Sequence, residues 1–440
     1  MFERVLIANR GEVAVRIVRA CRELGIESVA VYSTADRDAL HVRLADRAIH
    51  IGPPPGGESY LNVSSLVAAG ATTSCDAVHP GWGFLAENPD FARACEANGL
   101  VFVGPSAETI ETMGDKVRAK EAMGAAGLPL VPGSNGAAGL EQVEALAATM
   151  GFPLLLKAAA GGGGRGMRLV HSPEELADAF STASAEAEAA FSHGTLYAEK
   201  ALFGARHVEI QVLGDGEGGV LTLGERDCSI QRRHQKLIEE APSPAVSPAL
   251  RAEMEEAARH ACSSLRYRGA GTIEFLLDPD GRFYFIEMNT RLQVEHPVTE
   301  VLTGVDLAQA QIRIAAGEGL PTGGGVEFRG HAIEFRLNAE DPTRDFLPAP
   351  GTVACFRPPL GPGVRVDTHV FDGYAIPPYY DSLVAKVIVW AEDRPRALGE
   401  LEVAGVPTTR DVSMQILASE EFASGRYSTG YLAEAERRLP

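Results

Sequence analysis

The first 33 residues place the strongest constraint on the fold. Two short apolar runs, RVLI and SVAVYS, flank a segment that starts with a glycine turn and then repeats apolar residues every three or four positions. Those apolar residues are Val13, Ile17, Val18, Cys21 and Leu24. The spacing predicts a helix between two strands. Because a βαβ unit joins parallel strands, we expect the chain to begin with a parallel sheet.

Changes in composition divide the 440 residues into three parts, since a chain of this length exceeds one ordinary domain. CDAVHPGWGF and LVFVGP predict two further strands, separated by a helix that Asn88 caps and Pro89 begins. The glycine-rich PTGGGVEF near 321–326 predicts a later boundary, followed by the strand-like runs EFRLNAEDP, GVRVDTHVF and LVAKVIVW. The fold class is α/β, or α+β for the whole chain. The expected domains are residues 1–112, 113–320 and 321–440.

The stretch KAAAGGGGRGM matches the dinucleotide pattern G-x-G-x-x-G at Gly161, Gly163 and Gly166. A dinucleotide site needs a helix directly after the glycines, but MRLVH follows, and the helix start SPEELADAF comes only later. We therefore expect the glycines to join two strands. Such a loop can close over phosphates through its backbone N–H groups, and Lys157 at its entrance could reach a phosphate. A mobile loop without a ligand is the alternative.

The stretch GTIEFLLDPDGRFYFIEMNTRLQVEHP predicts a metal site. If Asp280 and Gly281 form a two-residue hairpin turn, Glu274 lies directly opposite Glu287. Like charges in that arrangement repel, and a divalent cation between them would reverse the sign. Oxygen ligands without histidine or cysteine favour magnesium or manganese. If the chain stays extended, the same polar face continues through Asn289, Arg291, Gln293 and Glu295. A solvated sheet face is the alternative.

Charge and composition exclude several classes of protein. The net charge of −19 argues against a nucleic-acid binder of the sequence-independent kind, because such binding depends on cations. No segment is long and apolar enough to cross a membrane, and the start MFERVLIANRGE does not resemble a signal peptide. The six cysteines lack the paired spacing of zinc or redox sites, so we expect reduced thiols in a cytoplasmic protein.

The lysines are few, six against 34 arginines, so they can mark positions where an ammonium is required. They are Lys116, Lys120, Lys157, Lys200, Lys236 and Lys386. One of them belongs to a basic cluster that could receive an anion, although such clusters are most often plain charged surface. The cluster consists of Gln231, Arg232, Arg233, His234 and Lys236.

Taken together, these motifs resemble the biotin carboxylase family of ATP-grasp enzymes. The resemblance runs from IANRGEVAVRI through HPGWGFLAEN, MGDK, KAAAGGGGRGM, ERDCSIQRRHQK, FIEMNTRLQVEHPVTE and PPYYDSLVAK to GRYSTGYL. It implies a Rossmann-like N-terminal domain, a central ATP-grasp domain and a C-terminal mixed α/β domain. The central domain would carry a mobile glycine-rich lid over about 131–203, which closes over ATP.

The resemblance also implies a role for individual residues. Nucleotide contacts fall on Lys116, Lys157, Gly163, Gly164, Met167, Glu199, Lys200, Leu202, His207, Gln231, His234, Glu274 and Glu287. Metal ligands fall on Glu274, Glu287 and Asn289. The bicarbonate site falls on Lys236, Arg291, Gln293 and the backbone of Val294. Glu295 matches the general base, and Arg336 the residue that faces the biotin ureido oxygen.

The implied cofactors are ATP and two magnesium or manganese ions. Since no lysine here stands in the Met-Lys-Met pattern of biotin carriers, we expect biotin on a separate carrier protein. The resemblance further implies separate carboxyltransferase subunits and a homodimeric enzyme. Acetyl-CoA carboxylase is the expected assembly. The alternatives are another acyl-CoA or pyruvate carboxylase, a different ATP-grasp ligase such as a carbamoyl-phosphate enzyme, or a catalytically silent nucleotide-binding subunit.

Two departures from the family pattern stand out. Ala159 and Ala160 occupy positions where relatives carry serine and glycine, which should stiffen the entrance of the lid. The stretch AEDRPRALGELEVAGV is shorter than in the family by about two helical turns, roughly seven residues. This shortening puts the helix of the C-terminal domain, and any dimer contact it makes, in question.

Overall fold

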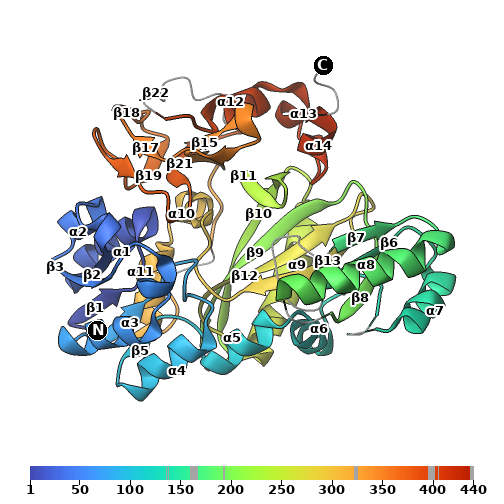
Figure 1. The fold of residues 1–440 in the computed structure, drawn as a ribbon, viewed down its shortest axis with the longest axis horizontal. Helices are drawn as coiled ribbons and strands as arrows, with labels where there is room; N and C mark the ends of the chain where they lie inside the picture. The colour runs from blue at the N-terminus through green and yellow to red at the C-terminus, as the bar shows by residue number, and fades with distance from the viewer. Residues whose placement is uncertain are drawn as a thin grey trace.

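The computed structural model describes residues 1–134, 136, 138–158, 167–191, 194–321, 326–394, 402–404 and 406–436. Its N-terminal part, its central part and its C-terminal part surround a common centre (Figure 1). Among the described residues, no helix combines the length and the apolar character needed to cross a bilayer. All six cysteines are free thiols, as expected, and all except Cys355 are buried.

The N-terminal part is a parallel five-stranded sheet in the order β3-β2-β1-β4-β5, flanked by helices (Figure 1). The expected βαβ unit is confirmed, because Leu6 of β1 pairs with Val29 of β2 in parallel. The Asn88 side chain accepts a hydrogen bond from the Phe91 N–H and caps the helix that Pro89 begins. The elements are β1 (Arg4–Ile7), α1 (Gly11–Leu24), β2 (Glu27–Ser33), α2 (Leu40–Leu44), β3 (Arg47–Gly52), α3 (Val63–Thr72), β4 (Ala77–His79), α4 (Pro89–Ala97) and β5 (Val101–Phe102).

The glycine run joins two antiparallel strands, as predicted, so it cannot be a dinucleotide turn. Lys157 pairs with Met167 across this hairpin. Gly163 and Gly164, the two alanines at 159 and 160, and the expected lid mobility over 161–166 lie outside the described residues. The hairpin and a third strand form a small separate sheet with two helices. The elements are α7 (Leu140–Met150), β6 (Leu154–Ala158), β7 (Met167–Val170), α8 (Pro173–Phe191) and β8 (Leu196–Lys200).

One antiparallel sheet of eight strands connects the central and C-terminal parts, in the order β13-β12-β9-β10-β11-β14-β21-β19. The predicted strands after residue 326 therefore extend a sheet that begins in the centre of the chain. The strands are β9 (Arg206–Asp215), β10 (Val220–Arg232), β11 (Gln235–Ala241), β12 (Arg268–Leu277), β13 (Phe283–Asn289), β14 (His331–Asn338), β19 (Val364–Thr368) and β21 (Leu383–Ala391).

Helices pack on this sheet, and short strands complete the C-terminal part. The buried core between the sheet and α9 includes Tyr267, Phe275 and Phe285, all fully buried. The helices are α5 (Ala107–Gly114), α6 (Lys116–Ala125), α9 (Pro248–Ser264), α10 (His296–Thr303), α11 (Leu307–Ala315), α12 (Arg410–Ala418), α13 (Glu420–Ala423) and α14 (Tyr431–Glu436). The short strands are β15 (Glu340–Asp341), β16 (Leu347–Pro348), β17 (Gly351–Thr352), β18 (Cys355–Arg357), β20 (Ala375–Ile376) and β22 (Glu402–Ala404).

The turn between β12 and β13 differs from the prediction. Asp278 N–H donates to the Arg282 carbonyl at 2.8 Å, and Gly281 N–H donates to the Asp278 carbonyl at 3.0 Å. Three residues, 279–281, therefore separate Asp278 from Arg282, the last hydrogen-bonded pair of the two strands. Gly281 has a φ of +83°, which a three-residue turn requires at this position and glycine adopts without strain. The predicted two-residue turn at Asp280 and Gly281 is wrong.

Glu274 nevertheless lies directly opposite Glu287. Phe275 pairs with Phe285, so the register changes by one residue between these two pairs, and Ile286 has no partner on β12. Such a β-bulge compensates for the longer turn. The predicted pairing of the two carboxylates is confirmed, although two local errors in its derivation cancelled.

Candidate active site

A cleft of about 910 Å³ lies where the three parts meet, and most of the predicted site residues line it. Those residues are Lys116, Lys157, Met167, Glu199, Leu202, His207, Gln231, His234, Lys236, Glu274, Glu287, Asn289, Arg291, Gln293, Val294 and Arg336. Among the described residues, two predicted ones do not line it. Glu295 is fully buried directly behind the wall of the cleft, and the Lys200 ammonium donates to the Met150 carbonyl at 2.7 Å.

Three carboxylates stand side by side across neighbouring strands of the large sheet. Glu209 on β9 pairs with Glu274 on β12, which pairs with Glu287 on β13. The Lys236 ammonium lies 2.6 Å from Glu209 and 2.8 Å from Glu274. The His207 imidazole lies 3.1 Å from Glu274. Burial alone would lower the pKa of His207, but the carboxylates raise it to about 9.

Glu287, in contrast, has no hydrogen bond or ion pair with the part of the chain that the structure describes. Burial, together with the charge of Glu274, raises the pKa of Glu287. The arrangement fits a divalent cation, because two opposed carboxylates and the nearby Asn289 amide offer only hard oxygen ligands. Asn289 presents its nitrogen to Glu274 at 2.9 Å and its oxygen to Arg291 at 2.9 Å, so ligation by that oxygen would require its release from Arg291.

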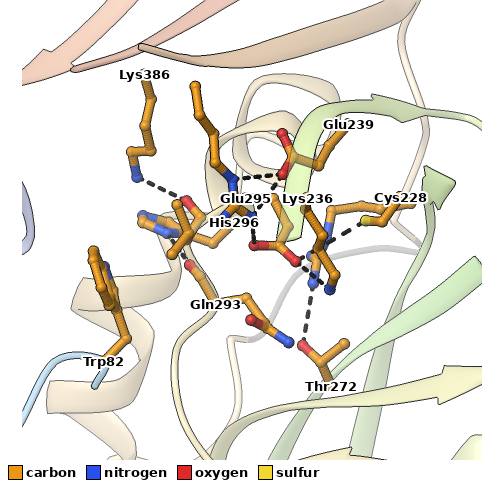
Figure 2. Close-up of polar contacts among 12 residues, drawn as sticks. Trp82, Cys228, Lys236, Glu239, Thr272, Gln293, Glu295, His296 and Lys386 are labelled. Carbon is orange, nitrogen blue, oxygen red and sulfur yellow. Dashed lines mark hydrogen bonds and ion pairs between the residues drawn. The ribbon is translucent and has the colours of Figure 1, made fainter. Parts of the chain in front are cut away.

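The predicted general base lies between two cations. Glu295 accepts from the Lys236 ammonium at 2.6 Å and from the Arg336 guanidinium at 2.9 Å. Figure 2 shows the Lys236 side chain reaching Glu295. Burial alone would raise the pKa of Glu295, but Lys236 and Arg336 lower it below its ordinary value. The carboxylate is therefore ionised at neutral pH, which a proton acceptor requires.

The expectation that the chain stays extended beyond Asn289 is wrong. Strand β13 ends at Asn289, and the chain turns through 290–295 into α10. The polar residues still converge, because Arg291 binds Asn289 and donates to the Gln293 side chain at 3.0 Å. Arg291 also donates to Glu87 at 2.7 Å. Glu87 belongs to the N-terminal part, so a residue 204 positions away fixes this arginine.

The nucleotide end of the cleft is built around one carboxylate. Glu199 is buried and lies 2.5 Å from the Lys157 ammonium, and it also contacts the ammonium of Lys120. Lys120 in turn lies over the Tyr197 ring, 4.2 Å from its centre. Two lysines held beside a cleft can pair with an anion, so Lys120 joins Lys157 as a candidate for a phosphate contact.

The basic cluster is partly neutralised. Asp345 accepts from Arg232 at 2.6 Å and from Arg233 at 2.8 Å. Arg233 and His234 form the turn between β10 and β11, with φ values of +48° and +67°. Among the described residues, His234 faces the cleft without a carboxylate partner, whereas Lys236 contacts Glu209, Glu274 and Glu295. An anion would therefore meet His234 directly and would compete with these carboxylates for Lys236.

A second pair of opposed carboxylates is buried behind Arg336. Glu239 on β11 lies opposite Glu334 on β14, and Arg336 donates to Glu239 at 2.7 Å. Neither oxygen of Glu334 has a hydrogen-bond partner among the described residues, and its side chain is fully buried. Burial raises the pKa of Glu334 well above its ordinary value and that of Glu239 to about 7. Glu334 therefore keeps its proton to a higher pH in the folded protein than in the unfolded chain.

This proton gives a testable dependence of stability on pH. The unfolded chain releases the Glu334 proton above about pH 4.3, whereas the folded protein releases it only at a higher pH, so the free energy of unfolding falls as pH rises between these two pKa values. Glu334→Gln removes this loss. We expect the variant to unfold at a higher temperature than the parent at about pH 8, with a smaller gain at about pH 5.5. Thermal unfolding at the two pH values checks this; an equal or smaller gain at the higher pH would contradict it.

The site depends on residues to which the sequence patterns assigned no role. Each of them stands in a quoted motif, in an alternating strand or among the six lysines, so the sequence offered a signal for it. The sequence patterns did not show that these residues lie close to the site in space. These residues are Trp82, Glu87, Lys120, Glu209, Arg226, Glu239 and Lys386.

Family profiles match nearly the whole chain. They are "Biotin carboxylase, N-terminal domain" over residues 1–110, "Carbamoyl-phosphate synthase L chain, ATP binding domain" over 115–322 and "Biotin carboxylase C-terminal domain" over 334–434. Together with the cleft, the matched ATP-binding domain defines the class: an ATP-grasp enzyme.

Individual proteins narrow this class. The chain is 54% identical to a biotin carboxylase of Nostoc sp., over 99% of this chain and 100% of the relative. It is 52% identical to one from Pseudomonas aeruginosa, over 98% of each chain. The chain belongs to the biotin carboxylase family.

Solved structures agree. A biotin carboxylase–ATP complex from Campylobacter jejuni superposes with a TM-score of 0.95 at 46% identity, covering 99% of each chain. The biotin carboxylase domain dimer of the Hydrogenobacter thermophilus 2-oxoglutarate carboxylase, with MgADP, ADP and bicarbonate, superposes with a TM-score of 0.93 at 48% identity. That match covers 99% of this chain and 98% of the other.

Proposed function

We propose that this enzyme uses ATP and bicarbonate to carboxylate biotin held on a separate carrier protein, the first half-reaction of acetyl-CoA carboxylase. One observation carries the proposal. Lys236, Glu295 and Arg336 form a linked row of charges that reaches the cleft beside the carboxylate pair of Glu274 and Glu287. A small anion can therefore be bound, deprotonated and placed next to a nucleotide phosphate within one cleft.

The nucleotide would lie between the small sheet that contains the glycine hairpin and the large sheet. We assign phosphate contacts to Lys116, Lys157 and His234, because phosphoryl transfer is accelerated mainly by positioning and charge neutralisation. The ribose and adenine contacts follow the family pattern. They fall on Met167, Glu199, Lys200, Leu202, His207 and Gln231, with the glycines at 163 and 164 closing over the phosphates.

Glu274, Glu287 and Asn289 would hold the divalent ions. A magnesium or manganese ion bound there would neutralise the negative charge of the phosphoryl group during its transfer. The residues of this chain prepare the site by placing Glu287 without a cation of its own, while Lys236 and His207 already compensate Glu274. The free carboxylate therefore favours an incoming cation.

Bicarbonate would bind at Lys236, Arg291, Gln293 and the Val294 N–H. Glu295 accepts its proton, which makes bicarbonate a nucleophile toward the γ-phosphate and yields carboxyphosphate and ADP. An anion that takes Lys236 or Arg336 as its partner weakens their hold on Glu295 and so raises its basicity at the moment it is needed.

Carboxyphosphate breaks into carbon dioxide and phosphate, and that phosphate can deprotonate the biotin ureido nitrogen. Arg336 would stabilise the negative charge that then develops on the ureido oxygen. Glu239 holds the Arg336 guanidinium at 2.7 Å, which orients the remaining N–H groups. The labile intermediate needs a site closed to water, which is the role we assign to the glycine-bearing lid.

The proposed reaction can be tested through its dependence on bicarbonate and biotin. We expect ATP cleavage to depend on bicarbonate and to be stimulated by free biotin, measured as ADP release with each omitted in turn. Cleavage that needs neither would favour another ATP-grasp ligase or a silent subunit. The acyl acceptor is a separate question, since structures similar to this chain include carboxylases of 2-oxoglutarate and pyruvate.

Partners and organisation complete the proposal. We propose a cytoplasmic homodimer that works with a biotin carboxyl carrier protein and carboxyltransferase subunits, and domains at 1–112, 113–320 and 321–440. The dimeric Hydrogenobacter thermophilus domain supports the dimer. Residues 395–401 and 405, where the chain looks shortened, lie outside the described residues. Identification of the proteins that co-purify with the enzyme, combined with light scattering, tests these assignments.

A further inference from the structure

The carbonyl groups of Gln293 and Val294, between β13 and α10, are each held by a fully buried side chain. The Lys386 ammonium donates to the Val294 carbonyl at 2.8 Å, and His296 Nδ1 lies 2.7 Å from the Gln293 carbonyl. A carbonyl only accepts hydrogen bonds, so His296 carries its proton on Nδ1. Burial, reinforced by the charge of Lys386, lowers the pKa of His296 well below its ordinary value, so the ring is neutral.

These two contacts fix the direction of backbone N–H groups. In a planar trans peptide the N–H points opposite to the preceding carbonyl. Holding the Gln293 carbonyl therefore sets the Val294 N–H, and holding the Val294 carbonyl sets the Glu295 N–H. Val294 lines the cleft, and among the described residues no protein group accepts from its N–H. That donor is free for an external acceptor.

Lys386 is itself held by a residue from the opposite end of the chain. Glu12 on α1 lies 3.3 Å from the Lys386 ammonium and also accepts from the Trp82 indole at 3.2 Å. Asp367 on β19 is more distant, at 3.9 Å. Figure 2 shows Lys386, His296 and Trp82 grouped on one side of Glu295, opposite Lys236.

Three sequence motifs thus meet at one point, although the proposed chemistry uses none of these residues. Glu12 comes from IANRGE, Trp82 from HPGWGF and Lys386 from DSLVAK. A buried ion pair alone is weak support for stability, because desolvation offsets its attraction. The contact that the pair makes with Val294 offers a reason for its presence.

We propose that Lys386 and His296 are positioning residues for bicarbonate, which orient the backbone of 293–295, and that Glu12 and Trp82 hold Lys386 in place. This rests on the proposed function, since it takes bicarbonate as the acceptor of the Val294 N–H. The roles are selective. They concern the small anion and leave the nucleotide contacts, which lie on other strands, unchanged.

The first test removes the Lys386 contact without leaving a buried charge unpaired. In Glu12→Gln/Lys386→Met we expect KM for bicarbonate to rise about tenfold, as for a lost charge-assisted hydrogen bond, with KM for ATP within about twofold of the parent. The control is Arg10→Met/Asp36→Asn, another buried pair from the same N-terminal segment, 2.6 Å apart, with no contact to 293–295. We expect it to lose thermal stability and to keep the ratio of the two KM values.

A second test does not depend on Lys386. Asparagine and leucine have similar size, but only asparagine can replace the Nδ1 donor. We expect His296→Asn to stay near the parent KM for bicarbonate, and His296→Leu to raise it about tenfold. Equal KM values in these two variants, or KM for ATP and bicarbonate rising together in the double variant, would overturn the positioning role. A parent enzyme whose ATP cleavage ignores bicarbonate would overturn the proposed function as well.

Discussion

Glu295→Gln is expected to lower kcat for bicarbonate-dependent ATP cleavage by about 10²–10⁴-fold, the usual contribution of a positioned general base. Glutamine has the same shape and can still accept from Lys236 or Arg336, so the pocket persists. It cannot take the bicarbonate proton at neutral pH. Steady-state ADP release at saturating bicarbonate measures the change.

Glu256→Gln is a matched control, since Glu256 is exposed on α9 and pairs only with Arg259 among the described residues. We expect it to retain the parent kcat. The thermal unfolding temperature of both variants shows whether each is folded. Retained carboxylation in folded Glu295→Gln would remove Glu295 from the mechanism, even if the family assignment is unaffected.

Glu287→Gln is expected to change stability and activity in opposite directions. It removes like-charge repulsion with Glu274 and a half-buried carboxylate that has no ion pair with a cation among the described residues, so metal-free protein should unfold at a higher temperature at neutral pH. The same change removes a metal ligand. We expect kcat to fall by about 10²-fold or more and the magnesium concentration for half-maximal rate to rise.

The expected gain in stability follows from the raised pKa of Glu287. The gain in stability should shrink as pH falls toward the ordinary carboxyl value of about 4.3, because Glu287 is then protonated in the folded and unfolded states alike. Glu217→Gln, on an exposed turn, provides the control. If the metal requirement stayed unchanged while stability rose, Glu287 would not be a ligand.

Local patterns predicted the fold well where neighbours in sequence determine the structure. The opening βαβ unit, the capped helix at Asn88 and the strand after the glycine run follow from periodicity and caps, which act over a few residues. The same reasoning was less secure at the carboxylate hairpin. The Glu274–Glu287 pairing held only because the bulge at Ile286 compensated for the longer turn.

Beyond Asn289, the prediction failed in its geometry but not in its choice of residues. An extended strand would have placed Arg291, Gln293 and Glu295 along one face, yet the chain turns there. They still gather, because Glu87 fixes Arg291, Gln293 reaches Glu274, and Lys236 with Arg336 fixes Glu295. Each of these partners comes from a different element.

The family, most of the strands and helices, and the residue types of the site follow from the sequence alone, because motif spacing and hydrophobic period are written in the order of residues. The way in which the charges are compensated depends on the tertiary structure. In the folded protein, a lysine and a histidine compensate Glu274, whereas Glu287 has no ion pair with a cation among the described residues. Glu12 and Lys386 lie together behind Val294. Such pairings join residues that are distant in the sequence, from 38 positions for Lys236 and Glu274 to 374 for Glu12 and Lys386, and their strength depends on distance and burial, which no local pattern encodes.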